Sequence, residues 1–189
     1  MKTTERIDPI KAFGAELYAI AKPARYLGGE LGSLQPIEAE DGRLRMALCF
    51  PDLYEIGMSN NAIRILYNEI ARLCPSVRCE RVFAPAPDFE ALLRRRDVPL
   101  YTLESGYPLS SCDIVGFSIG YELLATNMLT VLETGRIPLR AADRGEGDPI
   151  VIAGGPVSTN PHPFGAFLDA VFIGEAEAEF FDILADLAA

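Results

Sequence analysis

Two adjacent glycines follow a short apolar run and are suited to hold a ligand against the backbone. Residues 150–153 are apolar, and the run ends at Gly154 and Gly155. A second apolar run, residues 170–173, ends at Gly174. Such runs are typical of buried strands in a parallel sheet, and a glycine at a strand end lets a ligand approach the backbone closely. The sequence therefore predicts a binding wall at Gly154 and Gly155, with a tight turn that holds no ligand as the alternative.

A second group of candidate residues follows the first apolar run of the chain. Asp52, Tyr54 and Gly57 belong to a D-x-x-x-x-G frame directly after Phe50, and Ser118 lies near the end of another apolar run. The carboxyl ends of parallel strands meet at one edge of the sheet, where ligands bind in open α/β folds. We therefore expect these four residues to lie near the two glycines. Neither a P-loop nor a G-x-G-x-x-G sequence occurs in the chain, so a standard phosphate-binding loop is not expected.

Metal ligands and nucleophile–base pairs are scarce in this sequence. His162 is the single histidine, and the cysteines are Cys49, Cys74, Cys79 and Cys112. A four-ligand zinc site and a Ser-His-Asp or Cys-His arrangement without His162 are therefore not expected. Cys49 and Cys112 fall in apolar patterns that are typical of small buried thiols. We predict neither a metal site nor a catalytic residue within this chain.

The acidic residues that open the last predicted helix have two interpretations. Glu175, Glu177 and Glu179 alternate with small or apolar residues directly after Gly174. Carboxylates in that position could act as general bases, but they also complement the positive end of the helix dipole. We favour the structural interpretation.

Composition excludes several classes of function. The chain of 189 residues has a formal net charge of −10 and is 49% hydrophobic. An acidic chain does not provide the basic surface that a nucleic-acid groove needs. No apolar run approaches the roughly 20 residues of a membrane span, and acidic residues near the start do not suit a signal peptide. We expect a cytoplasmic protein with no nucleic-acid or membrane partner.

The periodicity predicts the elements that must position these residues. Apolar strand patterns alternate with amphipathic helix patterns, which favours a doubly wound α/β domain with a mostly parallel sheet in a three-layer Rossmann-type arrangement, as in flavodoxin-like folds. Residues 1–42 have no sustained period and form an extension that packs on the domain at 43–189. Ser59 or Asn60 is the expected cap of the first long helix, and Asp88 that of the second. The expected strands are 43–50, 77–83, 100–103, 113–119, 150–153 and 170–173, and the expected helices begin near 61, 88, 121 and 175.

The chain resembles the amino-terminal, cobalamin-binding-like region of a family of large radical SAM proteins. The resemblance extends over nearly all of the chain from about residue 22. The segments that carry it are KPARYLGGE (22–30), FPDLYEIGMS (50–59), ERVFAP (80–85), DIVGFSIGYELLATN (113–127), PLRAADRGEGDPIVIAGGP (138–156) and DAVFIGEAEAEF (169–180).

The resemblance implies a cofactor and a partner. Cobalamin-binding domains carry a cobalt-binding histidine in the D-x-H-x-x-G frame, where this chain has Tyr54. The resemblance therefore implies a module that binds cobalamin with its nucleotide tail against Gly154 and Gly155 and without a protein ligand on cobalt. The chain lacks the C-x-x-x-C-x-x-C triad, so the iron–sulfur cluster and S-adenosylmethionine would belong to a radical SAM catalytic domain of the same parent protein, beyond residue 189.

Two alternatives remain open at this point. A degenerate domain that has lost the cofactor could serve as a scaffold or recruit a substrate, and Tyr54 together with Gly120 in the place of a Ser-x-Leu motif favours this reading. A flavodoxin-like nucleotide binder is the third option, but it does not explain the extension at 22–32. In each case the chain alone is not expected to turn over substrate, whereas the parent would be a radical SAM enzyme.

Overall fold

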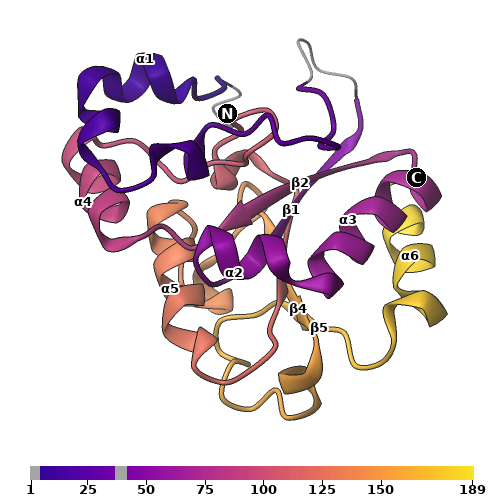
Figure 1. Ribbon diagram of the computed structural model, residues 1–189. Coiled ribbons are helices and arrows are strands. Elements are labelled where there is room, and N and C mark those ends of the chain that lie inside the picture. The colour runs from indigo at the N-terminus through magenta and orange to yellow at the C-terminus, as the bar shows by residue number, and fades with distance from the viewer. Residues whose placement is uncertain (1–4, 37–41) are drawn as a thin grey trace.

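The computed structural model describes residues 5–36 and 42–189 and places them in three layers around one parallel sheet (Figure 1). The five strands are β1 (Leu44–Phe50), β2 (Val77–Phe83), β3 (Ile114–Ser118), β4 (Ile150–Gly154) and β5 (Ala170–Val171). Their order in the sheet is β2-β1-β3-β4-β5, and all four neighbouring pairs are parallel. The predicted doubly wound α/β class is confirmed. The chain reverses its direction across the sheet between β1 and β3, which is the point where ligands bind in such folds.

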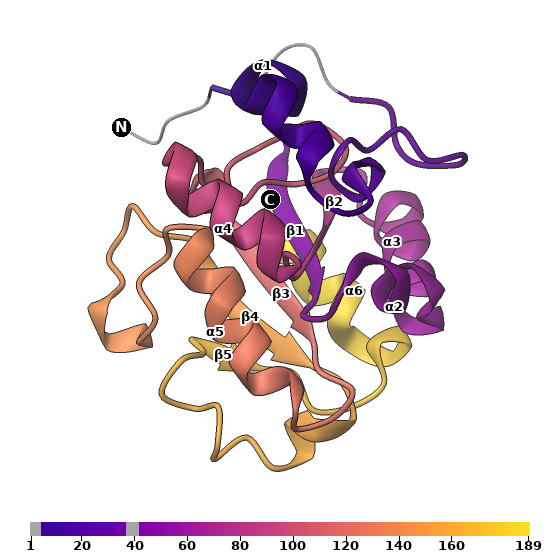
Figure 2. The same ribbon diagram turned by 60° about the vertical axis from the view of Figure 1, so that its left-hand side comes forward.

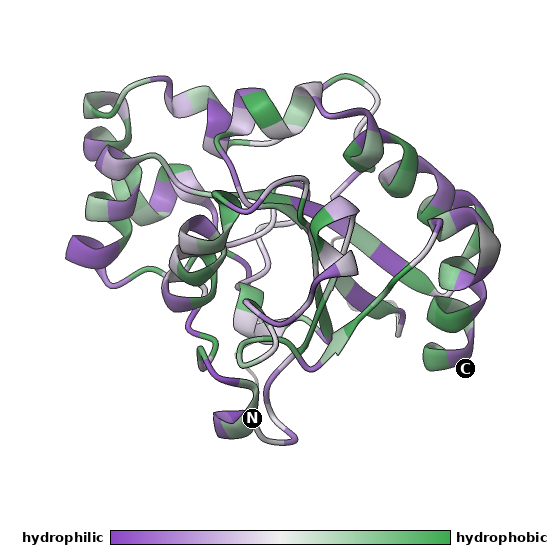
Figure 3. Cartoon of the chain, turned by 90° about the horizontal axis from the view of Figure 1, so that it is seen from below, coloured by the Kyte–Doolittle hydropathy of each residue, from purple (hydrophilic) through white to green (hydrophobic). Residues whose placement is uncertain are grey.

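Helices cover both faces of the sheet (Figure 2). On one face lie α3 (Asn61–Leu73) and α6 (Ala176–Leu187), and on the other lie α4 (Pro87–Arg96) and α5 (Leu124–Thr134). In Figure 3 these helices carry green and purple along their lengths, as amphipathic helices do. The short connections are α2 (Tyr54–Ser59) and the 3₁₀ turns η3 (Leu109–Ser111), η4 (Ala141–Asp143) and η5 (Pro156–Thr159).

Helix boundaries follow local capping chemistry. The side chain of Asn60 accepts hydrogen bonds from the amides of Ala62 (2.9 Å) and Ile63 (3.3 Å), which confirms it as the cap of α3. The prediction for the next helix is wrong, because α4 begins at Pro87 without a side-chain cap. Proline suits the first helical turn since its missing N–H would lack a partner there. Asp88 instead accepts a hydrogen bond from the amide of Ala21 at 2.7 Å.

The predicted strand at residues 100–103 is not a strand of the sheet. These residues form a buried loop, in which Tyr101 and Pro108 form an isolated antiparallel bridge. The amide of Leu103 also donates to the carbonyl of Arg81 at 2.9 Å. The loop therefore runs along the outer edge of β2, and its apolar side chains are buried without ladder pairing.

The described part of the extension lies against the same edge. It forms α1 (Pro9–Phe13), η1 (Gly14–Ala19) and η2 (Pro23–Tyr26). The ring of Tyr26 stacks on Phe89 of α4 with centroids 3.6 Å apart, and the amide of Ile7 donates to the carbonyl of Gly106 at 2.7 Å. The extension was predicted for 1–42, of which 1–4 and 37–41 lie outside the described residues. Its boundary at residue 42 stays a prediction.

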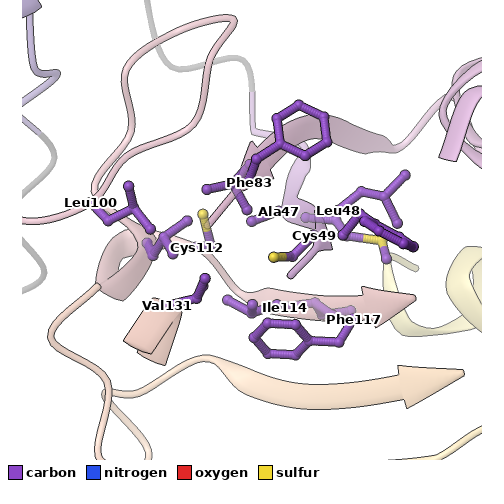
Figure 4. Packing of buried hydrophobic residues seen from close by; sticks show 14 of the residues in the cluster. Ala47, Leu48, Cys49, Phe83, Leu100, Cys112, Ile114, Phe117 and Val131 are labelled. Carbon is purple, nitrogen blue, oxygen red and sulfur yellow. The ribbon is translucent and has the colours of Figure 1, made fainter. Parts of the chain in front are cut away.

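The core is continuous between the sheet and both helical layers. The thiols of Cys49 and Cys112 lie among apolar side chains such as Ile114 and Val131 (Figure 4). All four cysteines are free and buried, and burial raises the pKa of the Cys49 and Cys79 thiols well above its ordinary value. Among the helices of residues 5–36 and 42–189, none has the length and apolar character that crossing a bilayer requires.

Candidate functional site

A cavity of about 260 Å³ lies between the sheet and the helix pair α3–α6, against the middle of β1 and beside the carboxyl ends of β3 and β4. It spans the place where the strand order reverses, between β1 and β3. Apolar side chains from all these elements form most of its lining, which includes Met46, Leu66, Gly116, Ser118, Ile152, Gly154, Gly155 and Phe172.

Two glycines, Gly116 and Gly154, lie on the strand surface that faces the cavity. Alternate residues of a strand point to the same face, so Gly116 and Ser118 of β3 share the cavity face, as do Ile152 and Gly154 of β4. A β-carbon on Gly116 would lie 2.6 Å from the end of the Met46 side chain, whereas one on Gly154 would meet nothing closer than 3.7 Å. Gly154 thus leaves open space at the strand end.

Three of the six predicted site residues line this cavity: Ser118, Gly154 and Gly155. Ser118 is 9% exposed, and its hydroxyl makes no hydrogen bond to another residue of the described chain, so it remains available to a ligand or to water. Gly155 has a backbone reason to be glycine. Its φ is 105°, and a β-carbon there would lie 2.8 Å from the carbonyl oxygen of Ile119.

The other three predicted residues, Asp52, Tyr54 and Gly57, do not line the cavity. Asp52 accepts hydrogen bonds from the amide of Leu53 at 2.7 Å and from the hydroxyl of Tyr121. That second bond joins the loops after β1 and β3. Gly57 lies against the ring of Phe83, which a β-carbon would approach to 2.1 Å. The glycine is required because α2 packs closely on β2.

Tyr54 holds the extension. Its hydroxyl donates to Glu30 Oε1 at 2.9 Å, and its ring packs edge-on against Phe83 with centroids 5.6 Å apart. Burial, followed by the hydrogen bond to Glu30, raises the pKa of Tyr54 to about 12. The phenol that stands at the place of a cobalt-binding histidine is therefore protonated, and its proton forms the hydrogen bond to Glu30.

The neighbouring residue on α2 is clamped from the extension as well. Glu55 Oε1 accepts from Lys22 Nζ at 2.8 Å and from Arg25 Nη2 at 2.7 Å. The hydrogen bond from Lys22, and then that from Arg25, lowers the pKa of Glu55 to about 2. Two consecutive residues of α2 thus bind the segment 22–30, which the sequence analysis singled out without a role.

A buried network of charged groups lies on β2, away from the cavity. Arg81 donates to Glu104 Oε1 at 2.6 Å and to Glu30 Oε2 at 3.0 Å. Arg78 donates to Glu80 Oε1 at 2.9 Å, and both of these side chains are at most 5% exposed. Burial raises the pKa of Glu104, while Arg81 opposes this effect. These pairs join β2 to the extension and to the loop after α4.

Metal ligands do not gather at the cavity. Within the described ranges no three His, Cys, Asp or Glu side chains lie together as a metal centre would require. His162 is exposed in the loop after η5. Glu177 and Glu179 lie in the first turn of α6, where the helix dipole accounts for them, and Glu175 precedes that turn.

Sequence reasoning missed Met46, Gly116, Ile152 and Phe172 as cavity residues. A glycine within the apolar run at 113–119 was the available signal, because a glycine inside a strand often marks a close approach. Their shared position could not be inferred without the strand register and the packing of α6.

A comparison with models of protein families gives a match. The family described as radical SAM proteins, N-terminal, matches residues 62–189, which is more than half of the chain. The match includes Ser118, Gly154 and Gly155 and begins after Asp52, Tyr54 and Gly57. A comparison with curated proteins gave no match. The chain, with its parallel sheet and its cavity at the strand reversal, belongs to the family of N-terminal domains of radical SAM proteins.

Proposed function

We propose that this chain is a ligand-binding and docking module of a radical SAM protein and that its cavity takes the flat nucleotide tail of a corrinoid. The observation that carries the proposal is the apolar cavity of about 260 Å³ beside Gly154. Ligand pockets in proteins occupy roughly 300–1,000 Å³. The cavity is therefore too small for a whole corrinoid but suits one planar ring group.

The lining residues fit such a group. Leu66 and Phe172 supply apolar contacts on the helical and strand sides, Met46 covers Gly116, and Gly154 adds no side chain to the sheet face. The polar side chains of the lining are those of Ser118, Glu175 and Glu177, and the Ser118 hydroxyl is the one on the sheet side that can fix an orientation. A bound corrinoid would supply a cobalt centre for radical or alkyl-transfer chemistry, while the residues of this chain would bind its tail and keep that tail away from water.

The residues that line the cavity include no histidine, cysteine or tyrosine. Tyr54 is bound to Glu30 and packs on Phe83, away from the cavity lining. His162 lies on an exposed loop. We therefore propose a corrinoid without a protein axial ligand. The iron–sulfur cluster and S-adenosylmethionine would belong to the catalytic domain of the parent protein, and the four free thiols suit a reducing cytoplasm.

A second candidate function is a scaffold without a cofactor. The observation that favours it is that Asp52 and Tyr54, which belong to the cofactor frame, form hydrogen bonds within the protein. In that case the domain would cover or position the catalytic domain, and the cavity would hold only water or a small apolar molecule.

Titration of hydroxocobalamin, followed by visible absorbance, separates the two candidates. Gly154→Val places a branched side chain on the cavity face without a close backbone clash. Gly147→Val is the matched control, because Gly147 lies in a loop with nothing within 4 Å of an added β-carbon. We expect saturable binding for the wild type and the control and at least about tenfold weaker binding for Gly154→Val.

Gly155→Val would not serve this purpose, since its positive φ and its contact with Ile119 predict a folding defect. Equal binding by all three proteins would place the corrinoid outside the cavity. Absence of binding in all three would support the scaffold. Loss of a histidine-ligated absorbance spectrum in His162→Ala would contradict the absence of an axial ligand.

A further inference from the structure

A groove of about 180 Å³ separates the end of α3 from the outer side of α6. Its lining comes from Leu73 and from α6, through the residues Glu177, Glu179, Phe181, Asp182 and Ala185. Of these, only Glu177 also lines the cavity described above. The groove is therefore a separate surface on the same helix pair, which lies on one side of the sheet in Figure 1.

The floor of the groove is apolar and fixed in place. Leu73, the last residue of α3, is 42% exposed although it belongs to the apolar side of that helix. Phe181 is 8% exposed and packs into the core. The Cys74 thiol donates to the carbonyl of Phe181 at 3.3 Å, so the end of α3 and the middle of α6 are joined. An apolar side chain from outside could cover Leu73 without a rearrangement.

The walls of the groove are acidic without compensating cations. After Arg144 the sequence has eight carboxylate residues and no lysine or arginine. Four of them, Glu175, Glu179, Asp182 and Asp186, follow the spacing of one helix face along α6. Within the described ranges none of these four forms an ion pair.

Helix stability does not explain why these four carboxylates lie on one face of α6. Carboxylates near the start of α6 are favourable because of the helix dipole, but Asp186 lies in the last turn, where the dipole disfavours it. Neighbouring carboxylates three and four residues apart also repel each other. The helix thus tolerates a repulsion that a positively charged partner would relieve.

We propose that this groove docks a basic amphipathic segment of a partner protein. An apolar side chain of that segment would cover Leu73 and Phe181, and lysine or arginine side chains would lie over Glu179 and Asp182. Because the groove walls are acidic, the partner segment must be positively charged. Because Leu73 is exposed, the segment must also carry an apolar side chain. The proposal does not depend on what the cavity binds.

The probe is a fluorescent helical peptide of leucine and lysine, and its counterpart with glutamate in place of lysine is the negative probe. Binding is measured by anisotropy with the whole chain. Glu179→Gln with Asp182→Asn should weaken binding about fivefold, because each exposed ion pair contributes a fraction of a kcal/mol to about one. The matched control, Asp143→Asn with Glu146→Gln, removes two exposed charges from the loop before β4, on the other side of the molecule in Figure 2.

A second pair of variants tests the apolar part. Leu73→Ser should weaken binding severalfold, whereas Leu123→Ser, at a more exposed leucine outside the groove, should not. Amide chemical shifts should change at Leu73 and along α6 on binding. Equal losses in both charge variants, or shifts spread over the whole surface, would show attraction by net charge alone and overturn the proposal. Site-specific binding of Mg²⁺, or dimerisation through this groove, would assign it to another occupant and overturn it too.

Discussion

Two neighbouring glycines in the extension differ in what surrounds them. Gly28 has φ +67°, and a β-carbon there would lie 2.1 Å from the carbonyl oxygen of Leu103. Gly29 has φ +80°, but nothing lies within 4 Å of an added β-carbon. A side chain at either position would adopt a strained left-handed backbone conformation. Only at Gly28 would its β-carbon also clash with backbone atoms.

Gly28→Ala should therefore destabilise the protein more than Gly29→Ala. We expect losses of about 3 kcal/mol for Gly28→Ala, which combines left-handed strain with overpacking, and about 1 kcal/mol for Gly29→Ala. Urea unfolding followed by circular dichroism measures both. Equal losses would mean that the extension does not contact Leu103 in solution.

The carboxylate of Glu55 should titrate far below its ordinary range. Its pKa is about 2 in the folded protein because Lys22 and Arg25 donate to it. A lowered folded pKa means that the stabilisation is complete above the ordinary value of 4.5 and is lost as the pH falls from there to about 2. Carbon-13 titration of the side chain measures this midpoint.

Replacement of both cations, Lys22→Met with Arg25→Met, should return the midpoint of Glu55 toward 4.5. A midpoint near 4.5 in the wild type would show that the clamp between the extension and α2 is open in solution.

At the scale of elements, β2 differs from its neighbours because its charged residues are buried. Glu80 accepts from Arg78 Nε (2.9 Å), Thr102 Oγ1 (2.6 Å) and the amide (3.1 Å) and hydroxyl (2.5 Å) of Ser105. This carboxylate joins the strand to the loop that runs along its edge. Edge strands need such cover, since their free backbone groups would otherwise pair with other chains.

Glu80→Gln should cost about 3 kcal/mol, because it leaves the buried Arg78 without its counter-charge. Glu133→Gln is the matched control. The Arg94–Glu133 pair has the same 2.9 Å separation as Arg78–Glu80, but its side chains are about half exposed. We expect a loss below about 1 kcal/mol there. Similar effects on the chemical denaturation midpoint would contradict the burial of the β2 network.

The sequence predicted the helices and strands better than the contacts between them. Unbroken apolar runs made β3 and β4 recognisable, and the amide side chain of Asn60 marked the start of α3. Residues 100–103 were mistaken for a strand because a loop buried under the extension has the same apolar pattern. The strand at 77–83 was predicted although it carries charged residues, and the structure shows that these charges are buried in ion pairs.

The candidate site was predictable in part for a similar reason. Gly154 and Gly155 are visible as a strand end, and parallel strands place Ser118 beside them. Asp52 and Tyr54 also follow a strand end, but Asp52 bonds to Tyr121 in the loop after β3, and Tyr54, at the start of α2, bonds to Glu30 of the extension. Contacts between residues that are 24 to 69 positions apart decide this, and no local pattern encodes them.

At the scale of the molecule, the extension is held by buried apolar side chains such as Phe13, Leu17 and Tyr26 and by polar contacts with residues that follow much later. Glu16 bonds to Arg95 at 2.7 Å, and Glu30 bonds to Arg81 at 3.0 Å. Arg25 is 12% exposed at its side chain. The extension therefore behaves as a strap over α4 and the β2 edge, as Figure 1 shows for α1 and α4.

Trypsin should cut slowly at Arg25 in the folded chain; Lys22 does not report on the strap, because Pro23 follows it and trypsin cleaves Lys–Pro bonds poorly. Glu30→Ala removes the bonds to Arg81 and Tyr54, and it should raise the cutting rate about tenfold through more frequent local opening. Glu146→Ala is the control, since Glu146 is exposed in a loop far along the chain. Rapid cutting in the wild type would show that the strap is not closed.

The long separation between the strap and its partners has a consequence for synthesis on the ribosome. The strap leaves the exit tunnel first, but Arg81, Arg95 and Gly106, which hold it, are translated 51 to 99 residues after their partners Glu30, Glu16 and Ile7. During that interval β1 and β2 are already available to pair, while the outer edge of β2 has no cover. The strap is thus made well before the residues that hold it, and it cannot reach its place in the native structure until they have been translated. Nascent-chain chaperones can bind the uncovered edge of β2 before residue 106 emerges.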